Sequence, residues 1–85
     1  MIETMLLRVT EVECTGPHQL RVVFDDESRV AVDLSDELHG EVFLPLRDPD
    51  YFRQVFLNPE TGTVEWPNGA DLAPTFLRER GTPLP

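Results

Sequence analysis

The sequence QLRVVFDDESRVAVDL at residues 19–34 contains two runs in which apolar and polar side chains alternate. In residues 19–25 every second side chain is apolar, and only Val23 breaks the polar face. Residues 29–34 alternate in the same way, and the polar sequence DDES at residues 25–28 joins the two runs. Because neighbouring side chains of a strand point to opposite faces, this pattern predicts two antiparallel strands that share one apolar face.

A third strand is predicted just before these two, at residues 6–14. Leu7 and Val9 share one parity, whereas Val12 and Cys14 share the other. A change of parity within a strand predicts a bulge, here near residues 10–11. The sequence TGPH that follows is typical of a turn, so the first half of the chain reads as a three-stranded meander.

The middle of the chain predicts a short helix and a hairpin. Asp48 suits the N-cap and Pro49 the first helical position, so we expect a helix that ends near Gln54. Residues 55–57 and 63–66 flank the sequence NPETG, whose Pro and Gly favour a hairpin with a longer loop. Residues 41–47 are apolar without a clear period around Pro45, and we expect a packed loop there.

The last predicted element is a helix that begins near Pro74 and ends at Gly81, with Phe76 facing the sheet. The expected order is therefore β-β-β-α-β-β-α, an α+β fold with two layers. One mostly antiparallel sheet of about five strands would carry two helices. We expect a single domain at residues 1–81 and a short C-terminal tail at residues 82–85.

Composition narrows the function classes. The 85 residues include 16 acidic and seven basic side chains, all seven of them Arg, and the net charge is −9. This charge repels phosphate and anionic lipid, so it disfavours nucleic acid and membrane surfaces, but it attracts a basic protein. No apolar run approaches the ~20 residues of a membrane span. Cys14 is the only cysteine, which excludes an internal disulfide, and the reducing cytoplasm is the expected location.

No catalytic set with recognisable spacing is found in the sequence, so we expect a protein that is not an enzyme and holds no metal or cofactor. The alternative is a small metal-binding protein or minor enzyme that uses His39 with Glu37 and Glu41, near Asp36. Their spacing matches no zinc pattern, and solvated charged loops have the same composition. Direct DNA recognition is the least favoured reading because of the charge.

The most distinctive stretch is GTVEWPNGADL at residues 62–72, which allows two interpretations. In one, Trp66 packs over the hairpin, Asn68 and Gly69 supply positive φ angles, and Asp71 accepts hydrogen bonds from backbone amides. In the other, Trp66, Asn68 and Asp71 contact a partner from a surface loop, since a Trp at a strand end can anchor an interface.

The chain resembles a small bacterial family known as domain of unknown function 2442. The matching features are the strand pair at residues 12–24, the sequence VDL at 32–34, LRDPDYF at 46–52, and TGTVEWPNGADLAP at 61–74. One departure is the sequence DES at residues 26–28, where such sequences often have an Asp-Gly turn. The resemblance implies an α+β domain without an established activity.

Members of this family are often encoded beside another small protein, which implies a two-gene module similar to toxin–antitoxin pairs. We therefore expect a protein-binding or regulatory domain whose partner is a basic protein encoded nearby. A homodimer is a second expectation, because an open sheet has two edges and a small core gains by burying one of them.

Overall fold

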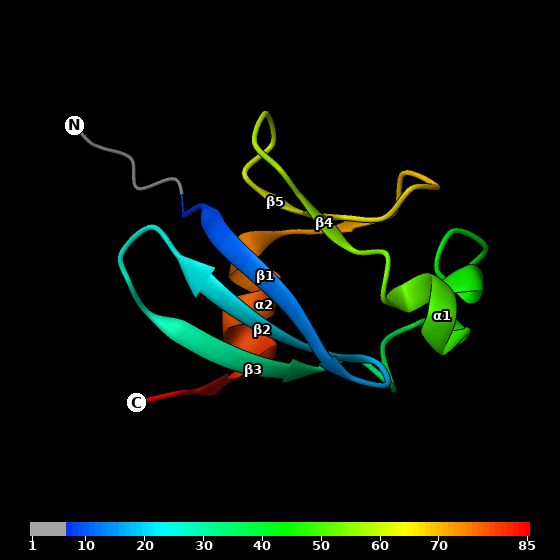
Figure 1. The fold of residues 1–85 in the computed structure, drawn as a ribbon, viewed down its shortest axis with the longest axis horizontal. Helices are drawn as coiled ribbons and strands as arrows, with labels where there is room; N and C mark the ends of the chain where they lie inside the picture. The colour runs from blue at the N-terminus through cyan, green and yellow to red at the C-terminus, as the bar shows by residue number, and fades with distance from the viewer. Residues whose placement is uncertain (1–6) are drawn as a thin grey trace.

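The computed structural model describes residues 7–85, and Leu6, the expected start of the first strand, lies outside them. In chain order the elements are β1 (Val9–Gly16), β2 (Gln19–Phe24), β3 (Arg29–Asp33), the 3₁₀ helix η1 (Leu44–Arg47), α1 (Pro49–Phe52), β4 (Phe56–Asn58), β5 (Thr63–Glu65), β6 (Asp71–Leu72), α2 (Pro74–Arg80) and β7 (Thr82–Pro83). Figure 1 shows β1, β2 and β3 side by side, with α1 at one end of the molecule.

The predicted meander is confirmed. β1 pairs antiparallel with β2, and β2 pairs antiparallel with β3. The register between β1 and β2 shifts between Val9 and Glu11, which is where the change of parity predicts a bulge. This shift lets Val9 and Val12, which have opposite parity, both contribute to the apolar side of the sheet.

The prediction of one five-stranded sheet is wrong. The strands form a four-stranded sheet in the order β1-β2-β3-β7 and a three-stranded sheet in the order β4-β5-β6. The hairpin of β4 and β5 pairs with β6 instead of extending the meander. Thr82 and Pro83, expected in the tail, form β7 and pair with β3. A strand of two residues is too short to show an alternation of apolar and polar side chains, so the sequence pattern cannot predict it.

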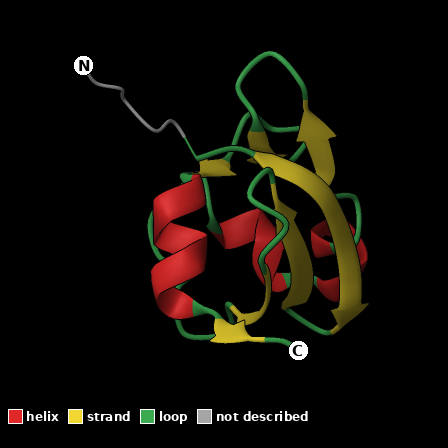
Figure 2. Ribbon diagram, turned by 90° about the vertical axis from the view of Figure 1, so that its left-hand side faces the viewer, coloured by secondary structure: helices red, strands yellow, loops and turns green. Residues whose placement is uncertain are grey.

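The core lies between the larger sheet and α2 and continues beneath the smaller sheet. Its buried apolar residues are Val9, Leu20, Val22, Phe24, Val30, Val32, Leu34, Leu38, Leu46, Phe52, Val64, Trp66, Ala70 and Leu77. In Figure 2 the longest helix, α2, lies on one side of the strands. Leu77 is the fully buried residue of α2, whereas Phe76, expected to face the sheet, is only half-buried.

The end of α2 approaches β3 closely at Gly81. A Cβ atom built on Gly81 would stand 2.6 Å from the Cβ of Val30, so only a glycine fits without a shift of the neighbours. The predicted end of this helix at Gly81 is therefore set by packing against the sheet.

The start of α1 is as predicted, but its end is not. The Asp48 side chain caps the helix by accepting a hydrogen bond from the backbone N–H of Asp50 at 3.0 Å, and Pro49 opens the helix. α1 ends at Phe52 rather than near Gln54. Within residues 7–85 the structure contains no helix with the length and apolar character that a membrane crossing requires.

Candidate binding surface

Trp66 lies in the core. Its side chain has no exposed surface, and its indole N–H donates a hydrogen bond of 2.8 Å to the carbonyl oxygen of Phe52. The two rings also pack against each other, with centroids 5.4 Å apart. The indole therefore ties the end of β5 to α1, and a contact with a partner would require it to leave the core.

The turn after Trp66 is built by Asn68 and Gly69. The Gly69 N–H donates to the Trp66 carbonyl at 2.9 Å, and the Trp66 N–H donates to the Ala70 carbonyl at 2.9 Å. Gly69 has φ +90°, whereas Asn68 has no positive φ, so only one of the two expected residues adopts that conformation. This geometry suits a turn that ends in a left-handed glycine.

Asn68 performs the backbone-bonding role that the first interpretation gave to Asp71. Its Oδ1 accepts a hydrogen bond from the Ala70 N–H at 3.1 Å, and its Nδ2 donates to the Val42 carbonyl at 2.8 Å. The second bond fastens the turn to the loop at residues 40–44, which is 26 residues away in sequence. Asp71 is exposed in β6, directly opposite Glu65 of β5.

The loop fastened by Asn68 exposes two large apolar side chains. Val42 is 43 % exposed and Leu44 is 47 % exposed, and they flank the half-buried Phe43. The backbone N–H groups of Phe43 and Leu44 both donate to the Gly40 carbonyl, at 3.0 and 3.1 Å. We call Val42, Leu44 and the exposed Pro67 and Asn68 of the adjoining turn the loop surface.

The sequence did not reveal Val42 and Leu44 as surface residues. Residues 41–47 were expected to be packed, and the structure buries only Leu46 of this stretch completely. The apolar residues around Pro45 have no regular spacing, whereas a buried helix or strand would impose one. This lack of a period was the signal that could have indicated exposed side chains here.

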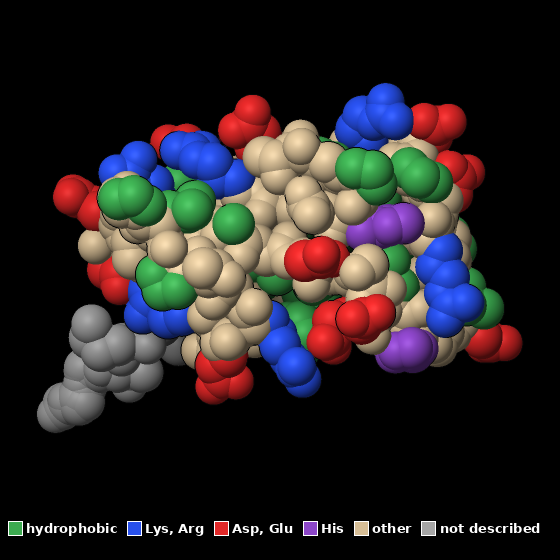
Figure 3. Space-filling model, turned by 90° about the horizontal axis from the view of Figure 1, so that it is seen from below, with side chains coloured by type: hydrophobic (Ala, Val, Ile, Leu, Met, Phe, Trp, Pro, Cys, Tyr) green, Lys and Arg blue, Asp and Glu red, His purple; other side chains and the backbone are tan. Residues whose placement is uncertain are grey.

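The charged side chains are arranged so that the arginines are largely occupied. Four arginines pair with carboxylates: Arg21 with Glu13, Arg53 with Asp50, Arg78 with Asp26, and Arg80 with Glu37. Two others donate to backbone carbonyls: Arg8 to Pro59 and Arg47 to Leu38. Within residues 7–85 these pairs use four carboxylates, against sixteen acidic residues in the chain. On the face in Figure 3, acidic side chains gather beside the two histidines.

The residues of the metal-binding alternative do not converge. The Nε2 atom of His39 lies 2.8 Å from the Asp36 carbonyl oxygen, and Glu37 pairs with Arg80 at 3.4 Å. In the part of the chain that the structure describes, no group of three His, Cys, Asp or Glu side chains is placed to hold a metal ion. His39 and Glu37 are thus engaged with different partners within the fold.

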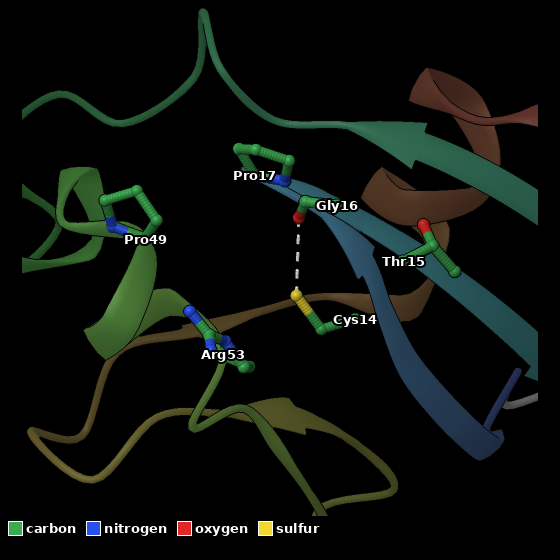
Figure 4. A pocket seen from close by; sticks show the side chains of 6 residues that line it. All are labelled: Cys14, Thr15, Gly16, Pro17, Pro49 and Arg53. Atoms are coloured by element: carbon green, nitrogen blue, oxygen red, sulfur yellow. Dashed lines mark hydrogen bonds between the residues drawn. The ribbon is translucent and has the colours of Figure 1, made fainter.

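A pocket of about 290 Å³ lies between the β1–β2 hairpin and α1, and Figure 4 shows its lining. The lining residues are Cys14, Thr15, Gly16, Pro17, Pro49 and Arg53. The Cys14 thiol donates a hydrogen bond to the Gly16 carbonyl at 3.4 Å, and the Arg53 guanidinium is held 2.7 Å from Asp50. The thiol and the guanidinium of this pocket are therefore already bonded within the protein.

Residues 9–83 match the family described as protein of unknown function (DUF2442), and the chain belongs to that family. The match covers every strand and helix of the structure. No curated protein and no solved structure matches the chain.

Proposed function

We propose that the protein is a non-enzymatic binding domain that recognises a basic protein and acts as the acidic, regulatory member of a two-protein module in the cytoplasm. The observation that carries this proposal is the pairing of charges. The chain has a net charge of −9, and the arginines that could neutralise its carboxylates are mostly bonded within the fold.

This arrangement favours a cationic partner. Carboxylates without a neighbouring cation produce a negative potential that extends about 10 Å at 0.1 M salt. Such a potential accelerates the approach of a positively charged protein and repels polyanions. The expected complex therefore forms quickly and weakens as salt is added.

Glu65 and Asp71 support the same conclusion. They stand directly opposite each other in neighbouring strands, a placement that destabilises a sheet when the charges have the same sign. Asn58 donates a hydrogen bond of 2.8 Å to Glu65, but this bond does not neutralise the pair. A Lys or Arg of a partner would relieve the repulsion on binding.

Because the family resemblance implies a two-gene module, the partner to test is the protein encoded by the adjacent gene. We expect the two proteins to co-purify at ~0.05 M salt and to separate at ~0.5 M salt, because the attraction is screened. An unrelated protein of equal negative charge serves as the control and should not retain the partner. Absence of a complex at low salt would refute the proposal.

A matched pair of variants sharpens the experiment. Neutralising Glu65 and Asp71 together, as Glu65→Gln and Asp71→Asn, should weaken the complex and leave the fold intact. The control variant, Glu27→Gln with Glu79→Gln, removes the same number of charges from exposed positions in the β2–β3 turn and on α2. Equal loss from both changes would show that net charge, and not this pair, determines binding.

A further inference from the structure

We infer that the loop surface, through Val42 and Leu44, is the apolar anchor of the partner complex, and that it fits a protein with an apolar recess edged by Lys and Arg. This inference rests on the proposed function and adds the place and chemistry of the contact. Its first support is exposure, since Val42 and Leu44 are two of the four large hydrophobic residues found exposed within residues 7–85. They stand two positions apart, Val42 in the loop before η1 and Leu44 at the first position of η1.

The loop is held in shape before any partner arrives. Phe43 packs against the core between the two exposed side chains. Asn68 donates to the Val42 carbonyl at 2.8 Å, and the Arg47 Nε donates to the Leu38 carbonyl at 2.9 Å. A loop fixed in this way loses little conformational freedom when it binds, which is the property of a preorganised contact.

The charges around the loop surface are acidic. Glu41 precedes Val42, and Asp48 and Asp50 follow the loop at the start of α1. Arg53 pairs with Asp50, and Arg47 donates to a backbone carbonyl while keeping its positive charge, so Glu41 and Asp48 supply the local acidic excess. An apolar centre with an acidic rim is complementary to an apolar centre with a basic rim.

The position of the loop surface indicates whether a second copy of this chain or a different protein binds there. The loop and the turn after β5 both lie at the α1 end of the molecule in Figure 1. A symmetric dimer through this end would bring Glu41 and Asp48 of two copies together, and each copy carries a charge of −9. Like charges therefore oppose self-association here, and the occupant is a basic protein.

The test measures binding of the adjacent-gene product at low salt to Val42→Ser, Leu44→Ser and the double variant. Leu84→Ser is the matched control, because Leu84 is also exposed (36 %) and the C-terminus lies away from α1 in Figure 1. We expect each loop variant to weaken binding about tenfold or more, as for anchor residues, and the control to bind like the wild type. The melting temperatures should stay unchanged because the substituted side chains are exposed.

The outcomes separate the two proposals. If the wild type binds and the double variant binds equally well, or Leu84→Ser loses as much, the inference is overturned and the proposed function stands. If the wild type binds nothing, both fall. If light scattering shows a wild-type dimer that Leu44→Ser dissociates, the occupant is a second copy and the inference is wrong.

Discussion

The Trp66 side chain connects the end of β5 to α1, so replacing it should destabilise the protein. Trp66→Ala removes a fully buried aromatic side chain and should lower the free energy of unfolding by roughly 3–5 kcal/mol. Trp66→Phe keeps an aromatic ring beside Phe52 but removes the indole hydrogen bond to the Phe52 carbonyl, which still accepts from the Val55 N–H at 3.2 Å. The loss of that one bond should cost about 0.5–1.5 kcal/mol. Urea unfolding followed by circular dichroism measures both changes, and a loss below about 1 kcal/mol for the alanine variant would contradict the structural role.

Glu27 occupies a backbone conformation that suits glycine. Its φ is +72°, in the turn between β2 and β3. A left-handed conformation costs a residue with a Cβ about 1–2 kcal/mol, part of which glycine returns through its greater freedom when unfolded. Glu27→Gly should therefore raise the free energy of unfolding by about 1 kcal/mol.

Glu27→Ala separates the backbone effect from the charge effect. Alanine removes the same carboxylate but keeps the Cβ, so it should give little of the gain. Urea unfolding of the wild type and both variants makes the comparison. Equal stabilisation by alanine and glycine would assign the effect to the lost charge instead of the φ angle.

The loop and turn residues show what a sequence can reveal at this scale. Asn68 was expected to adopt a positive φ or to contact a partner, whereas in the structure it builds the turn through its side chain. Its bond to Val42 joins positions 26 residues apart, so no local pattern contains it. Trp66 allowed a buried and an exposed interpretation, because both place a large aromatic side chain at a strand end. The exposure of Val42 and Leu44 depends on what packs beneath Phe43, which is again a contact between distant segments.

At the scale of elements, long periodic strands and capped helices were predictable. The meander, the bulge, the Asp48 cap and the start of α2 at Pro74 all follow from local chemistry, whereas the end of α2 at Gly81 also depends on packing against β3. The division into two sheets was not predictable, because it depends on β6 and β7, which have two residues each. Short strands form where tertiary packing brings a chain beside an existing edge, so their signal lies outside their own sequence.

The contact between the β2–β3 turn and α2 should depend on pH. Hydrogen bonds from the Ser28 hydroxyl and backbone N–H, together with Arg78, lower the pKa of Asp26 from 3.8 to about 2. The Arg78 Nη2 lies 2.5 Å from the Asp26 carboxylate and 2.7 Å from the Ser28 hydroxyl. Because the carboxylate is favoured in the folded state, its stabilisation is complete above pH ~4 and is lost as the pH falls through ~2.

Asp26→Asn should therefore be less stable than the wild type at neutral pH, and the difference should shrink between pH ~4 and ~2. Ser28→Ala removes the largest cause of the shift and should move the closing of this difference to higher pH. Urea unfolding across this pH range gives the comparison. A difference that stays constant down to pH ~2 would show that the Asp26 charge does not link the turn to α2.

For the whole molecule, the fold places a modest core inside an elongated body of 41 × 27 × 18 Å. A domain of this length buries only ~60 % of the surface of its unfolded chain, so small terms decide its stability. One such term is the repulsion that comes from the net charge of −9. Folding brings the excess carboxylates closer together and so increases this repulsion. Self-repulsion and attraction of a basic partner are thus two consequences of the same charge.

Self-repulsion predicts that salt stabilises the folded protein at neutral pH. Raising the salt from ~0.01 to ~0.3 M shortens the screening length from about 30 Å to less than 10 Å, so distant repulsions fade while the close ion pairs lose little. A gain of about 1 kcal/mol would raise the melting temperature by roughly 4–8 °C in a domain of this size. The same titration near pH 4.4, the isoelectric point, is the control and should show almost no rise because the net charge is zero. A melting temperature that falls with salt at pH 7 would mean that the four ion pairs outweigh the repulsion within the folded protein.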